Sequence, residues 1–94
     1  MKIKDGFLLR EVAGNTIVVP IGDDAVSFNG VITINETGKF IWELLDRGIE
    51  KEELLEKFMS EYQVSEVDAK EDIRAFIQEL LDNDIMTLWF IKRL

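Results

Sequence analysis

The stretch TINETGKFIWELL, at positions 33–45, changes its hydrophobic period in the middle. Its first residues alternate between polar and apolar, as in a half-buried strand, whereas its later apolar residues recur at spacings of three and four, as on one face of a helix. Asn35 is a favourable N-cap, and Gly48 is a typical residue at which such a helix ends. The sequence therefore predicts a strand over Val31–Ile34 that passes directly into a helix.

The residues before this junction are predicted to form a β-hairpin. The runs FLLREVA and TIVVPI, both rich in strand-forming residues, flank Gly14 and Asn15, which suit a two-residue turn. Pro20 has no backbone N–H group, so we expect it at a strand end or with its nitrogen facing outward. Together with Val31–Ile34, the hairpin predicts an antiparallel sheet of about three strands.

Three helices are predicted to follow the sheet. The second is expected over about Glu50–Tyr62, and the third opens with SEVD at Ser65–Asp68, a near capping box, and extends to about Asn83. Apolar residues recur along the third helix at helical spacing: Ala69, Ile73, Phe76, Ile77, Leu80 and Leu81. The order of strands and then helices predicts an α+β fold of winged-helix type, in one domain spanning residues 1–94.

Two segments are less well defined by the sequence. Asn29-Gly30 is a strong turn signal, but whether residues 25–28 form a strand before it is left open. The last ten residues, IMTLWFIKRL at positions 85–94, are rich in strand formers, and we expect a final strand or an extended arm. Trp89 and Phe90 could cover the sheet or pair with its free edge, either in the same chain or in a second copy, which would give a homodimer.

The composition argues against catalysis. The 94 residues include no histidine and no cysteine, so the commonest general base, the commonest metal ligands and the thiol nucleophile are missing. The sequence also contains no glycine-rich phosphate loop. We therefore expect no catalytic residues, no metal site and no cofactor. No apolar run is long enough to span a bilayer and no signal peptide is evident, so a cytoplasmic protein without a membrane partner is expected.

The charge argues against a nucleic-acid partner. The chain has a formal net charge of −8, and residues 65–84 contain seven acidic side chains against Lys70 and Arg74. A recognition helix in the major groove lies between phosphates and is expected to be basic. A winged-helix DNA-binding regulator, which the order of elements alone would allow, is thus disfavoured.

Two motifs give the chain a family resemblance. INETG at positions 34–38 and IWELLDRG at positions 41–48 resemble the PqqD-like family, named for pyrroloquinoline-quinone biosynthesis protein D. The family pattern is a strand, Leu-Asn-x-Thr-Gly, and a helix of the form x-x-Ile-Trp-x-Leu-Leu-x-Gly. Here Ile34 replaces the leucine and Arg47 is inserted before the glycine. The resemblance extends more weakly over residues 7–86, and the aromatic tail is not part of the family pattern.

The resemblance implies a binding function. Members of the family recognise ribosomally made, modified peptides: they take the leader segment of a precursor peptide as an added strand beside the third strand, and a modifying enzyme is recruited alongside. For this chain the implied partners are a precursor leader and a modifying enzyme, for example a radical S-adenosylmethionine enzyme. The implied peptide-binding residues lie on the third strand and the third helix: Val31, Ile32, Thr33, Ile34, Ala69, Asp72, Ile73, Phe76 and Ile77.

Several alternatives remain open at this stage. The third helix could face the peptide with its Asp72 edge, which we favour, or with the edge that carries Lys70 and Arg74. Gly38 could avoid a clash inside the fold or leave room for another backbone. Trp42 is expected to close the core. A scaffold that binds other proteins through the aromatic tail is the remaining rival function.

Overall fold

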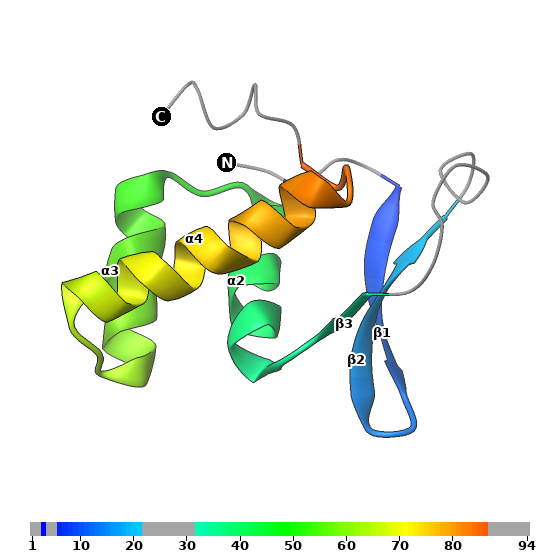
Figure 1. The fold of residues 1–94 in the computed structure, drawn as a ribbon, viewed down its shortest axis with the longest axis horizontal. Helices are drawn as coiled ribbons and strands as arrows, with labels where there is room; N and C mark the ends of the chain where they lie inside the picture. Colours follow the sequence, from blue (N-terminus) through cyan, green and yellow to red (C-terminus); the bar gives the residue numbers. More distant parts are fainter. Residues whose placement is uncertain (1–2, 4–5, 22–31, 87–94) are drawn as a thin grey trace.

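The computed structural model of the chain describes Ile3, residues 6–21 and residues 32–86. Its elements follow one another as β1 (Phe7–Val12), β2 (Asn15–Pro20), β3 (Ile32–Ile34), α2 (Glu36–Arg47), α3 (Lys51–Tyr62) and α4 (Glu66–Asp82). The strands form a narrow sheet at one side of the molecule and the helices pack together at the other, with β3 leading into α2 (Figure 1). The predicted α+β fold, with three antiparallel strands followed by three helices, is confirmed.

The sheet has the order β1-β2-β3, and both pairs of neighbours are antiparallel. Pro20 is the last residue of β2, as predicted, and it lies opposite Phe7. Ile32 pairs with Val18 on β2. Among the residues that the structure describes, β3 has no other strand beside it, so it forms one edge of the sheet.

The turn between β1 and β2 differs from the prediction by one residue. Ala13 and Gly14, rather than Gly14 and Asn15, form the turn, and both have positive φ angles, of 52° and 82°. The core determines this shift, because the observed register sets Leu9 opposite the fully buried Val18. The predicted turn would instead have placed Glu11 opposite Val18, with both side chains on the same face of the sheet.

The helix boundaries agree with the caps that the sequence suggests. The side chain of Asn35 accepts a 2.8 Å hydrogen bond from the Gly38 N–H group at the start of α2. Gly48 ends this helix at a φ angle of 85°, with its N–H group donating to the Leu45 carbonyl. Ser65 caps α4 by accepting from the N–H group of Asp68. The predicted starts of α2 and α4 are therefore confirmed.

One hydrophobic core joins the sheet to the helices. Val18 and Ile34 enter it from the sheet, and Phe58, with no exposed surface, enters it from α3. Trp42 is 2% exposed, so the prediction that it closes the core is confirmed. Among the described residues, the other buried apolar side chains are those of Ile3, Ile41, Leu44, Leu45, Ile49, Leu54, Ala69, Ile77, Leu80, Ile85 and Met86.

Some predictions concern residues outside those described. They are the possible strand at residues 25–28, the turn at Asn29-Gly30, the strand residue Val31, and the tail from residue 87 onward with its two aromatic residues. Within the described part of the chain, no helix is both long and apolar enough to cross a membrane.

Candidate functional site

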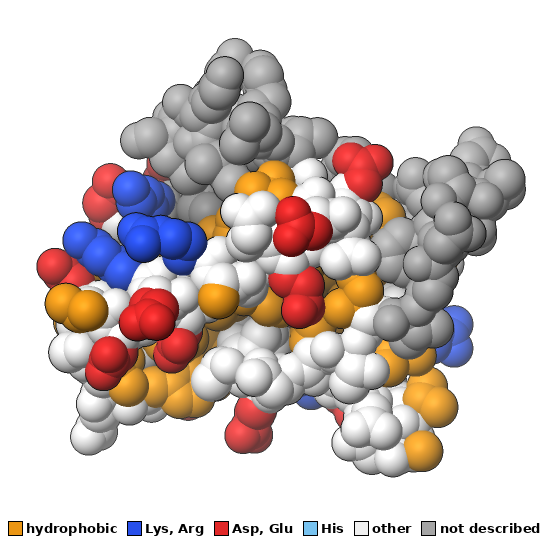
Figure 2. Space-filling model, in the orientation of Figure 1, with side chains coloured by type: hydrophobic (Ala, Val, Ile, Leu, Met, Phe, Trp, Pro, Cys, Tyr) orange, Lys and Arg blue, Asp and Glu red, His pale blue; other side chains and the backbone are white. Residues whose placement is uncertain are grey.

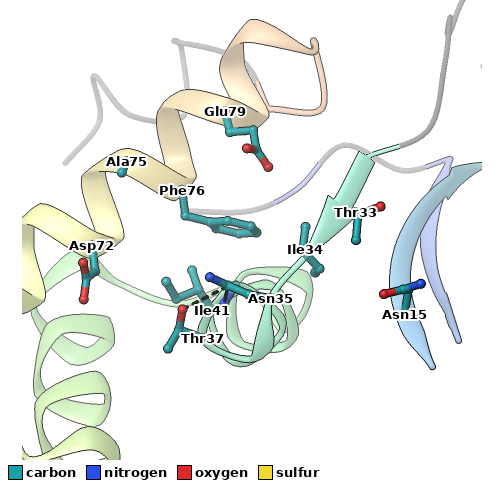
Figure 3. A pocket seen from close by; sticks show the side chains of 11 residues that line it. Asn15, Thr33, Ile34, Asn35, Thr37, Ile41, Asp72, Ala75, Phe76 and Glu79 are labelled. Atoms are coloured by element: carbon teal, nitrogen blue, oxygen red, sulfur yellow. Dashed lines mark hydrogen bonds between the residues drawn. The ribbon is translucent and has the colours of Figure 1, made fainter.

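An open groove of about 770 Å³ separates β3 and the start of α2 from one face of α4 (Figure 3). It brings together residues that are up to 64 positions apart in the sequence. The groove is lined by Asn15, Thr33, Ile34, Asn35, Thr37, Gly38, Ile41, Asp72, Ala75, Phe76 and Glu79.

The first wall of the groove is β3. Thr33 is exposed, Ile34 is 6% exposed and Ile32 is intermediate, so the strand alternates between the core and solvent as predicted. An edge strand presents unpaired N–H and C=O groups, which are a ready template for a further strand. Among the described residues no strand occupies that position, so the groove adjoins a free edge of the sheet.

The second wall is the first turn of α2, where Gly38 is buried beneath Phe76. A Cβ atom on Gly38 would lie 2.9 Å from Cε1 of the Phe76 ring and 3.2 Å from Oδ1 of Asn35. Real Cβ atoms do not approach a ring carbon this closely without displacing it. A contact inside the fold therefore accounts for a glycine at this position, which is one of its two interpretations.

The third wall is the face of α4 that carries Asp72, Ala75, Phe76 and Glu79. This is the edge of the helix that we favoured, and Lys70 and Arg74 are not among the lining residues. The Phe76 ring points from α4 toward Ile34 and Asn35, with Asp72 and Glu79 to either side of it along the helix (Figure 3).

The structure does not bring every predicted binding residue into the groove. Thr33, Ile34, Asp72 and Phe76 line it, and Ile32 lies on the strand beside it. The three other helix residues do not line the groove: Ala69 is fully buried, Ile77 is 8% exposed, and Ile73 packs against the core. These three residues lie on the side of α4 that packs against the core, whereas the residues that line the groove lie on a different side of the same helix.

Sequence reasoning missed seven of the lining residues. Two of them, Ala75 and Glu79, follow Asp72 at spacings of three and seven, so the helical period starting from Asp72 would have found them. Asn15 would have required the correct hairpin register. The residues Asn35, Thr37, Gly38 and Ile41 come from the N-cap and first turns of α2. We had interpreted this segment as a cap and an apolar stripe, and had considered only Gly38 as a place where another backbone could pass.

Electrostatic contacts outside the groove join the hairpin to α2. The hydroxyl group of Thr16 donates a 2.7 Å hydrogen bond to the Glu11 carboxylate, and the Lys39 ammonium group lies 3.1 Å from the same oxygen. The hydrogen bond from Thr16, followed by the one from Lys39, lowers the pKa of Glu11. The same carboxylate raises the pKa of Lys39. Among the residues described, no group of three or more acidic side chains could hold a metal ion.

The fold and the groove define a class of small α+β domains that offer a free strand edge beside a helix. The family model for coenzyme PQQ synthesis protein D (PqqD) matches residues 15–86, a range that contains every lining residue of the groove. The chain therefore belongs to the PqqD family. No curated protein sequence is a significant match to the chain.

Two solved structures have the same fold. TbiB1 in complex with the TbiA(beta) leader peptide is similar with a TM-score of 0.71 and 22% sequence identity, over 90% of this chain and 93% of that chain. Lasso peptide synthetase B1 complexed with the leader peptide is similar with a TM-score of 0.69 and 22% identity, over 87% of this chain and 91% of that chain. At this level of identity, the comparison confirms the fold.

Proposed function

We propose that this protein is a non-catalytic recognition domain, which binds the leader segment of a ribosomally synthesised precursor peptide in the groove between β3 and α4. The observation that carries the proposal is the edge of β3, which no other described strand occupies, beside an open groove in a member of the PqqD family. That the two similar structures were both solved with a leader peptide supports it.

The mode of binding would be strand addition. Backbone groups of β3 would pair with the leader and supply affinity, while the groove would take alternate side chains and supply selectivity. Thr33 and Phe76 would contact the peptide from opposite walls. Since the described part of β3 has only three residues, the interface falls at the small end of specific complexes, and a few apolar side chains of the leader would dominate the affinity.

The remaining predictions form part of the same proposal. Val31 would extend the binding edge, while Ala69, Ile73 and Ile77 would hold α4 at the right distance from it. The bound leader would be presented to a modifying enzyme, for example a radical S-adenosylmethionine enzyme, in the cytoplasm. DNA is disfavoured as a partner because the exposed side chains of α4 are mainly acidic.

The test is an amide NMR titration of the full chain with leader peptides from short reading frames encoded nearby. We expect shifts at Ile32–Ile34 and along the groove face of α4. Thr33→Trp should fill the groove and abolish these shifts, whereas Ser60→Trp, the same change at an exposed position on α3, should leave them intact. Two outcomes would instead favour a scaffold that binds proteins through its tail. One is that the amide shifts gather elsewhere; the other is that no candidate peptide causes shifts, even after deletion of residues 87–94.

A further inference from the structure

The groove carries negative charge and no positive charge on its lining residues. Asp72 and Glu79 are the only ionisable residues among the eleven that line it, and both are exposed. Within the described part of the chain, neither carboxylate takes part in an ion pair, since the pairs found there join Lys39 to Glu11 and Lys70 to Glu66.

The two carboxylates flank an apolar surface. Phe76 stands between them on α4, and its ring faces Ile34 across the groove (Figure 3). In the space-filling view, acidic side chains lie next to apolar surface over the middle of the molecule, whereas the main cluster of basic side chains lies at the end with α3, where further acidic side chains surround it (Figure 2). The groove thus offers an apolar contact with negative charge beside it.

The spacing along α4 matches the spacing along a strand. Asp72 and Phe76 are four residues apart, which is about 6 Å along a helix axis. Side chains on the same face of a strand repeat every two residues, or about 6.7 Å. A strand that lies beside β3 and along α4 can therefore place one side chain over the Phe76 ring and the next one on that face beside the Asp72 carboxylate.

We propose that the groove selects peptide strands in which a lysine or arginine stands two residues from an apolar residue. This inference rests on the function proposed above and names the class of leader that the site accepts. The apolar side chain covers Phe76, the cation meets Asp72, and Glu79 extends the preference for positive charge on the other side of the ring. A leader with acidic residues at these positions is repelled.

The expected effect on affinity is modest because the carboxylates are exposed. Exposed ion pairs are weak and are screened by salt, but charge complementarity discriminates strongly between partners and raises the association rate. Reversing one charge replaces an attraction by a repulsion, so we expect a loss in affinity for a basic peptide of about threefold to tenfold at low salt.

The test is a selection of random twelve-residue peptides on the full chain, followed by NMR and affinity measurement of the selected peptides. Three proteins are compared: wild type, Asp72→Lys, and the control Glu71→Lys. The control makes the same change in net charge at the neighbouring position, which is exposed and does not line the groove. Both substituted positions are on the surface of α4, so both variants are expected to fold.

We expect wild type and Glu71→Lys to select peptides with a basic residue two positions from an apolar one, and Asp72→Lys to select acidic residues there. Selected peptides that shift the β3 amides without any preference for basic residues would overturn this inference and leave the proposed function standing. Equal effects of the two substitutions would also overturn it, because the preference would then follow net charge alone. If no peptide binds any of the three proteins, both the inference and the proposed function fail.

Discussion

The two outer strands of the sheet differ in what lies beside them. β1 has six residues, including the charged pair Arg10 and Glu11, and its residues do not line the groove. β3 has only three described residues, carries no charged side chain, and adjoins both α2 and the groove face of α4. Charged residues on an edge strand discourage pairing with another strand. The comparison teaches that, of the two outer strands in the described part of the chain, only β3 has a helix that supplies a second wall beside its edge.

The largest expected effect tests the register of β3. Ile34 is 6% exposed and belongs to the core, so Ile34→Asp would bury an unpaired charge and remove an apolar side chain. We expect it to destabilise the fold by at least about 3 kcal/mol, measured by chemical denaturation. The exposed neighbour is the control: Thr33→Asp should change the stability by less than about 1 kcal/mol.

An inverted result would refute the assigned faces of the strand. If Thr33→Asp unfolded the domain and Ile34→Asp did not, β3 would be shifted by one residue, because a single-residue slip moves every side chain to the opposite face. The face of β3 that we assign to the groove would then be the face that packs against the core.

The next largest effect comes from a comparison of the N-cap residues of α2 and α4. Asn35 and Ser65 each accept a hydrogen bond from an N–H group of the first turn, but only Asn35 lines the groove. Replacing either by alanine should cost about 1 kcal/mol of stability. Only Asn35→Ala should also weaken peptide binding, because it loosens the junction that ends the β3 edge. Thermal denaturation and a peptide titration of both variants would show this; equal losses of affinity would place Asn35 outside the binding site.

A smaller change in stability is expected for Gly38→Ala. Alanine favours a helix over glycine by up to about 1 kcal/mol, which offsets part of the cost of displacing the Phe76 ring by the new Cβ atom. The ring would move within the groove, so peptide affinity should fall although the fold remains. The loss should disappear in a Phe76→Ala background, which a double-mutant cycle of affinities measures. A loss that persists there would mean that the glycine acts on the peptide directly.

These contrasts also show how far the sequence could predict the molecule. The break in hydrophobic period at Asn35 and the caps at Gly48 and Ser65 depend on local chemistry, so the elements were predicted almost to their ends. The turn at Ala13-Gly14 was missed because burial of Val18, a contact across strands, determines the register. Turn propensity alone had favoured a turn at Gly14-Asn15, one residue further along the chain.

The site was predicted in part for a similar reason. Asp72 and Phe76 followed from choosing one edge of the third helix, but an apolar stripe cannot distinguish residues that face the core from those that face a groove. Ala69 and Ile77 fulfil the same sequence pattern as Phe76 and are buried. Phe76 is intermediate in exposure, and its ring packs over Gly38 at the edge of the core.

The smallest expected effect concerns the β1 edge. Because the hydrogen bond from Thr16 is the main cause of the lowered pKa of Glu11, Thr16→Val should raise that pKa more than Lys39→Met does. A lowered pKa in the folded state means that the contribution of Glu11 to stability is present above its ordinary value of 4.5 and is lost as the pH falls through the folded-state value. An NMR titration of the Glu11 side-chain carboxyl carbon in wild type and the two variants measures these pKa values.

Peptide affinity is the control. Since the contacts of Glu11 lie outside the groove, peptide affinity at neutral pH should be unchanged in both variants. A loss of affinity would show that the β1 edge and the groove are coupled through α2.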